Sequence, residues 1–284
     1  MMRFIFILIA ALMAPFPVSH ASEIGNPAPE IRAYESNSTD ELGLLQTLIE
    51  AKKLYELQDY QKAVRLFSLI VKYDPTLESA VTGLAETYIA LSRPEAALEL
   101  LEASPVQSKA LKRIEILAEA LNMKTKAREP FLKTAVENTP DPRLFNLYAK
   151  TLVENGNYSA ARLAYRKAET LGQNPGVFLN NLGMLELKQG NTKRAASLLF
   201  RAQNAAPEEP RFNNNYRLAL LLEGDYIKAL DNIESDRAAD FLTDGAFIAL
   251  SQNEIDLAKL LFEKANKISP VFHPRAQYGL ALLK

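Results

Sequence analysis

The sequence predicts an all-α protein made of stacked helix–turn–helix units. Similar segments recur every 34 residues, as in 142–156 (PRLFNLYAKTLVENG), 176–190 (GVFLNNLGMLELKQG) and 210–224 (PRFNNNYRLALLLEG). Within each segment the apolar residues follow the period of an amphipathic helix, and a glycine closes the segment. Prolines follow the second helix of several units and separate it from the next unit.

The composition suits a protein with a substantial core and no nucleic-acid partner. The chain has 284 residues, of which 48% are hydrophobic. Its 34 acidic and 33 basic residues nearly balance, so the net charge is −1. A nucleic-acid partner requires a basic excess or a basic stripe, and the charges here are interspersed.

The first 21 residues differ from the rest of the chain. Arg3 precedes an apolar run over 4–14, and small residues stand at Ser19 and Ala21. This pattern predicts a secretory signal peptide at 1–21, cleaved near Ala21; the alternative is an uncleaved N-terminal anchor. The chain has no cysteine that could bear a lipid. We therefore expect a periplasmic protein without a lipid anchor, which associates with the outer membrane, if at all, only through partners.

The elements follow in order along the mature chain. Residues 22–43 are polar, contain two prolines and predict a flexible lead-in. The repeat region covers 44–284, and two of its units, 78–108 and 109–141, keep few of the recurrent residues. Unit 210–238 ends early. The predicted units are 44–77, 78–108, 109–141, 142–175, 176–209, 210–238 and 239–272, followed by a terminal helix at 273–284.

The unit 176–209 shows the repeated pattern best. Leu182 and Gly183 mark its first helix, and Ala195, Leu199 and Ala202 mark its second. This pattern and its period resemble the tetratricopeptide repeat (TPR), a helix–turn–helix of 34 residues. The chain departs from the repeat signature because it has no tryptophan, and because Arg217 stands where a small residue is expected.

The resemblance implies a right-handed TPR superhelix, an α-solenoid of about seven repeats plus a C-terminal helix. Such a fold forms because one helical pair cannot bury its apolar face alone, whereas stacked pairs bury a continuous core. In TPR proteins the first helix of each pair lines a concave groove, through positions 2, 5, 9, 12 and 13 of the unit. The resemblance therefore implies a non-catalytic scaffold that binds a protein or peptide.

This register predicts a partner-binding groove across the three units that begin at 142, 176 and 210. An asparagine recurs at position 5 of each, where its amide could pair with the backbone of an extended peptide. The alternative is that these amides bond between adjacent repeats or cap helices. The basic members would favour an acidic partner or a C-terminal carboxylate. The predicted groove residues are Arg143, Asn146, Lys150, Asn180, Met184, Lys188, Arg211, Asn214 and Leu218.

No motif in the sequence indicates catalysis, a cofactor or a metal. His273 lacks the partners that a metal site needs. The chain has no thiol nucleophile and neither of the glycine-rich phosphate-binding motifs. We therefore predict that the protein is not an enzyme; a deep pocket with clustered buried carboxylates would favour the opposite.

The consecutive N-N-L-G and N-N-Y motifs at 180–183 and 214–216 also resemble the TPR proteins of tight-adherence (Flp-type) pilus assembly. Those proteins are usually outer-membrane lipoproteins that help a secretin assemble, and the missing cysteine is a departure from them. The resemblance implies an adaptor in pilus or secretion-system assembly, with a secretin or another assembly component as partner. The alternative is a general envelope scaffold for cell-wall or outer-membrane machinery.

Overall fold

The computed structural model describes residues 41–269 and 272–283, and within these ranges the chain is helical and contains no strand. Helical hairpins follow one another along the chain, which confirms the predicted fold class. The predicted signal peptide lies outside the described residues. So does the lead-in up to residue 40, whereas 41–43 already belong to the first described helix.

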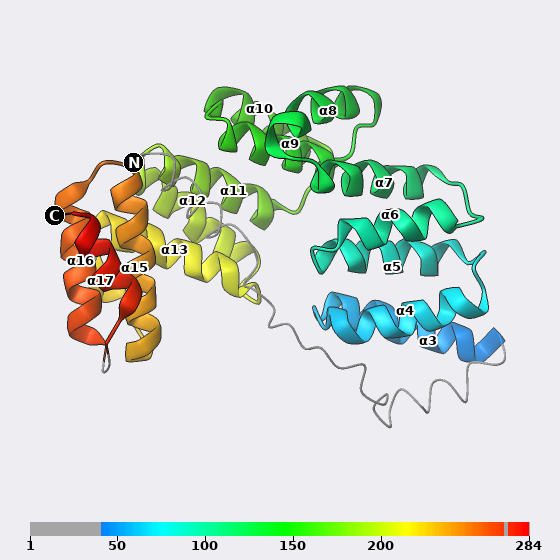
Figure 1. Cartoon of the computed structure of the whole chain (residues 1–284), viewed down its shortest axis with the longest axis horizontal. Coiled ribbons are helices and arrows are strands. Elements are labelled where there is room, and N and C mark those ends of the chain that lie inside the picture. Colours follow the sequence, from blue (N-terminus) through cyan, green and yellow to red (C-terminus); the bar gives the residue numbers. More distant parts are fainter. Residues whose placement is uncertain (1–40, 270–271, 284) are drawn as a thin grey trace. The chain divides into compact units, whose positions relative to one another are not determined.

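The described residues form two compact units (Figure 1), an N-terminal unit that ends at Asn155 and a C-terminal unit that begins at Gly156. Both consist of antiparallel helices that pack against their neighbours in the chain. The N-terminal unit holds α3 (Glu41–Glu56), α4 (Tyr60–Tyr73), α5 (Glu78–Ala90), α6 (Pro94–Ala103), α7 (Lys109–Asn122), α8 (Thr125–Asn138) and α9 (Pro142–Glu154). The C-terminal unit holds α10 (Tyr158–Thr170), α11 (Pro175–Lys188), α12 (Thr192–Ala205), α13 (Pro210–Glu223), α14 (Tyr226–Ala229), α15 (Ser235–Ser251), α16 (Ile255–Ile268) and α17 (Pro274–Leu282).

Glycines end the three helices from which the repeat was recognised. Within two residues of the ends of α9, α11 and α13, the residues Gly156, Gly190 and Gly224 have φ angles of 79°, 77° and 94°. Glycine adopts this left-handed conformation without the steric cost that a Cβ imposes. The predicted closure of each helix by a glycine is confirmed.

Prolines and polar caps start the helices. Pro142, Pro175 and Pro210 each occupy the first turn of a helix, where a missing N–H costs nothing. These prolines therefore begin the next unit as well as separating it from the last. After the turns, Asn157 and Asp225 accept hydrogen bonds from backbone N–H groups three residues on, both at 3.3 Å.

Small residues allow the helices to approach closely, as the pattern predicts. A Cβ on Gly183 would lie 2.5 Å from Cγ of Leu199, which is fully buried on the second helix of the same hairpin. The same relation joins consecutive hairpins, because Gly83 on α5 faces the ring of Phe67 on α4. A glycine at these places leaves room for one large apolar side chain of the neighbouring helix.

One buried charge holds the first hairpins of the C-terminal unit together. Glu186 on α11 is fully buried and forms ion pairs with Arg162 on α10 and, at 3.3 Å, with Arg194 on α12. The side-chain amide of Asn191 donates a hydrogen bond of 2.8 Å to the other carboxylate oxygen of Glu186. Burial raises the pKa of Glu186, but these hydrogen bonds and charges outweigh it, and the net pKa is lowered.

Arg217 binds the end of the short helix in the sixth unit. Its guanidinium donates to Asn213 Oδ1 at 2.6 Å and to the carbonyl oxygens of Ala229 and Asp231 at 3.1 and 2.7 Å. These carbonyls lie at and just beyond the end of α14, which has 4 residues against 14 in α12. The last carbonyls of a helix have no partner within it. The arginine therefore satisfies carbonyl groups at the end of the short second helix.

Replacing Arg217 with alanine is expected to lower the free energy of unfolding by about 2 kcal/mol, because two carbonyls, one of them partly buried, lose a charged donor. Chemical denaturation followed by circular dichroism measures this loss. Arg201→Ala, an exposed site on α12, serves as the control and should change stability by less than about 0.5 kcal/mol. Equal effects in the two variants would show that Arg217 is not needed for the short unit.

Candidate functional site

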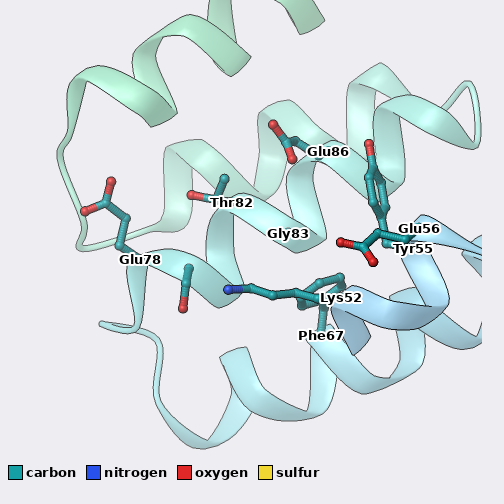
Figure 2. Close-up of a pocket in the computed structure, with 9 residues that line it drawn as sticks. Lys52, Tyr55, Glu56, Phe67, Glu78, Thr82, Gly83 and Glu86 are labelled. Atoms are coloured by element: carbon teal, nitrogen blue, oxygen red, sulfur yellow. The ribbon is translucent and has the colours of Figure 1, made fainter. Parts of the chain in front are cut away.

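A cleft lies between α3 and α5 in the N-terminal unit, and its volume is about 450 Å³. Figure 2 shows side chains of α3 projecting toward the exposed side of α5, with α4 beneath them. We call this the α3–α5 cleft. It is lined by Lys52, Tyr55, Glu56, Phe67, Glu78, Ser79, Thr82, Gly83 and Glu86.

The apolar floor of the cleft is formed by Phe67. Phe67 is 1% exposed, and its ring packs where a Cβ on Gly83 would otherwise stand. Because Gly83 has no side chain, the Phe67 ring of α4 fits between α3 and α5. A floor built this way is preformed, which is typical of ligand sites.

A tyrosine and a carboxylate mark one end of the cleft. Burial, and then the negative charge of Glu86, raise the pKa of Tyr55 to about 12. The ring of Tyr55 packs edge-on against Tyr60 at a centroid distance of 5.5 Å, which fixes its orientation.

Glu86 already binds a cation from a distant part of the same unit. Nη1 of Arg143, in the first turn of α9, donates to Glu86 Oε1 at 2.6 Å. The same guanidinium pairs with Asp141 at 3.2 Å. Asp141, whose side chain caps α9, is 4% exposed. Arg143 thus joins α5 to α9 across 57 residues of sequence.

The structure places the first three predicted groove residues on α9, in the N-terminal unit. Arg143 is exposed, but its guanidinium is engaged by two carboxylates. Asn146 is half-buried and Lys150 is exposed. The charge of Arg143 is therefore balanced within the protein, which disfavours an acidic partner at this residue.

Asn180, on α11, does not reach solvent as the groove prediction requires. It is 5% exposed, and its carbonyl oxygen accepts a hydrogen bond of 2.7 Å from the amide of Asn215 on α13. Its own amide donates to Asn181 at 3.5 Å. This is the bond between adjacent repeats that the sequence left open as the alternative. Asn180 is therefore not counted among the residues that a partner could contact.

The other predicted residues of the C-terminal unit divide by exposure. Leu218 is 6% exposed and packs in the core. Asn214 and Arg211 are exposed, and Arg211 pairs with Glu209 at 3.6 Å. Met184 and Lys188 are half-buried. No single surface of this unit collects all six predicted members on α11 and α13.

A second cleft of about 590 Å³ lies in the C-terminal unit, near the ends of α11, α13 and α15. Beside it, the side-chain amide of Gln252 donates to the carbonyl of Leu187, which ties α15 to α11 past the short sixth unit. Its lining is more polar than that of the α3–α5 cleft. The lining residues are Lys188, Gln189, Gly190, Thr192, Leu222, Gln252, Glu254 and Leu257.

Within the described residues, no group of three or more histidine, cysteine or carboxylate side chains could hold a metal ion. Across the same part of the chain, no helix has the length and apolarity to cross a membrane.

Sequence reasoning missed the α3–α5 cleft, although the signal was present. Counted from the predicted unit starts at 44 and 78, six of its residues stand at the repeat positions that the TPR resemblance assigns to the groove. The recurrent asparagines lie in later units and do not line this cleft. The six residues are Lys52, Tyr55, Glu56, Ser79, Thr82 and Glu86.

These features define a class of protein, a helical-repeat solenoid with the TPR fold. The tetratricopeptide repeat family model matches residues 54–110, which include most of the cleft. No curated protein matches the sequence significantly.

Three solved structures are similar to the chain to different degrees. A thermophilic TPR protein of Thermus thermophilus is 22% identical with a TM-score of 0.52, over 63% of this chain and 99% of that one. A tetratricopeptide repeat protein from Parabacteroides merdae is 14% identical with a TM-score of 0.45, over 84% and 98% of the two chains. Pseudomonas aeruginosa pilF is 15% identical with a TM-score of 0.39, over 88% of this chain and 99% of that one. The first of these supports the shared fold.

Proposed function

We propose that this protein is a non-catalytic adaptor that binds a segment of another protein in the α3–α5 cleft. The observation that supports this most is the coincidence of the cleft with the groove positions of the repeat. Helical solenoids use surfaces of this kind to bind partners. A preformed apolar floor with a few polar groups around it suits the side chains of an extended or helical segment.

We further propose that the adaptor acts in the cell envelope, in the periplasm, in the assembly of a tight-adherence pilus or a secretion system. This finer proposal is supported by the predicted signal peptide and by the N-N-L-G and N-N-Y motifs. The likeness to pilF is too weak to add to it. A general envelope scaffold is the second candidate, because the same leader and repeats would serve it equally.

Photo-crosslinking in the organism that encodes the chain tests both levels of the proposal. A photoreactive amino acid at Thr82, inside the cleft, is expected to capture one envelope protein. The same group at Glu99, exposed on α6, is the control and should not capture it. With the photoreactive group kept at Thr82, Ser79→Arg in the same cleft should abolish the capture at an unchanged melting temperature, because a large side chain blocks the cleft.

Each result has a separate meaning. Identical capture at Thr82 and Glu99 would contradict binding in the cleft. A specific partner that resides in the cytoplasm would support the adaptor and contradict the envelope location. A pilus or secretion component as the captured protein would favour the first envelope role, and a cell-wall enzyme would favour the general scaffold.

A further inference from the structure

Resting on the adaptor function proposed above, we propose that the α3–α5 cleft selects a basic segment of its partner. A lysine or arginine side chain would lie along the ring of Tyr55 and place its charge beside Glu86 and Glu56. The partner class is therefore a cationic, partly apolar peptide segment, opposite in charge to the acidic partner that the sequence alone suggested.

The first reason is the charge of the lining. Glu56, Glu78 and Glu86 contribute three carboxylates. Two cations face them, the ammonium group of Lys52 and the Arg143 guanidinium that pairs with Glu86, so one negative charge remains in excess. Such an excess attracts cations and repels an acidic segment, and charge complementarity of this kind mainly sets which partner is selected. An apolar floor beneath charged groups suits the long methylene stem of lysine or arginine.

The second reason is that Glu86 already holds a guanidinium. Arg143 reaches it from α9 at 2.6 Å, and the side chains of both partners remain accessible, at 43% and 30% exposure. Arg143 binds through Oε1, while an ionised carboxylate can accept at both oxygens. The internal ion pair thus shows that Glu86 is placed to bind a cation, and a cation of the partner would displace Arg143 from it.

The third reason is the position of Tyr55 between the charged groups. It follows from Figure 2 that Tyr55 and Glu56 project from the same end of α3, opposite the part of α5 that carries Glu86. A cation over the face of a tyrosine ring gains a further attraction, and nearby carboxylates strengthen its binding.

Binding is tested with fluorescein-labelled peptides that alternate leucine with lysine, glutamine or glutamate and are otherwise identical. Fluorescence anisotropy with the full chain is expected to give the lysine peptide an affinity about tenfold above that of the glutamate peptide, since several exposed charge pairs each contribute a few-fold. Glu56→Gln combined with Glu86→Gln should remove most of this preference. Glu99→Gln on α6 is the matched control and should leave it unchanged.

Arg143→Ala provides the sharper measurement. If the arginine competes with the ligand for Glu86, its removal should raise the affinity for the lysine peptide about threefold, as expected for one exposed ion pair. If the peptide were attracted nonspecifically to other acidic surfaces, its affinity would not depend on whether Arg143 is paired with Glu86. Weaker binding in Arg143→Ala than in the wild type, with the melting temperature unchanged, would overturn the proposal.

The remaining outcomes separate this inference from the function on which it rests. Equal affinities for the three peptides would overturn the selection of a basic segment and leave the adaptor function standing. So would specific crosslinking of a partner at Thr82 without binding of the lysine peptide. The absence of both crosslinking and peptide binding would contradict the adaptor function itself.

Discussion

Phe67→Ala is expected to lower the free energy of unfolding of the N-terminal unit by about 4 kcal/mol. The ring is 1% exposed, packs against Gly83 and belongs to the core cluster that joins α3, α4 and α5. A glycine opposite the ring offers no side chain that could move into the space, so the cavity would persist. Denaturation by guanidinium, followed by circular dichroism, measures the loss.

Leu45→Ala is the matched control, because Leu45 lies on α3 and is 53% exposed. It should change stability by less than about 0.5 kcal/mol. Phe67→Ala should also remove peptide binding under conditions where the chain remains folded, since the ring forms the floor of the cleft. A loss below about 1 kcal/mol would contradict the tight packing described for Phe67 and Gly83.

Arg162→Ala is expected to cost the C-terminal unit about 3 kcal/mol, because the variant leaves a fully buried carboxylate with weaker compensation. Glu186 would keep Asn191 and Arg194, but Arg194 is 64% exposed and lies farther away. We therefore expect a loss of stability at the lower end of the range observed when a buried ion pair is broken. Thermal and chemical unfolding of the variant measure it.

Two comparisons make this prediction specific. Arg166→Ala, an exposed change on the same helix, should have almost no effect. Adding Glu186→Leu to Arg162→Ala should recover part of the stability, because the unpaired charge is then gone. If the double variant is less stable than Arg162→Ala alone, the unpaired charge is not the cause.

The effect should also depend on pH. The folded pKa of Glu186 lies below its unfolded value of about 4.3. Its stabilising contribution is therefore complete above the unfolded pKa and is lost as the pH falls through the lower, folded pKa. The stability difference between wild type and Arg162→Ala should accordingly shrink in acid.

The sequence by itself determined the repeated hairpins. The period, the closing glycines, the capping residues and the small residues at helix contacts act within one unit or between neighbours in the chain. Local rules therefore suffice to read them, as Gly190 and Gly183 show. The short sixth unit could also be read, but not the use of Arg217 to satisfy the end of α14.

Only the tertiary structure decided which polar side chains face solvent and which pair with distant ones. Asn180 and Asn214 share one repeat position, yet the first is buried against Asn215 and the second is exposed. Arg143 meets Glu86 across 57 residues, and this contact changes the charge expected of the partner. The rotation between successive hairpins depends on the volumes of all the side chains packed between them. A repeat position therefore predicts the face of a helix but not the neighbours that the face will meet.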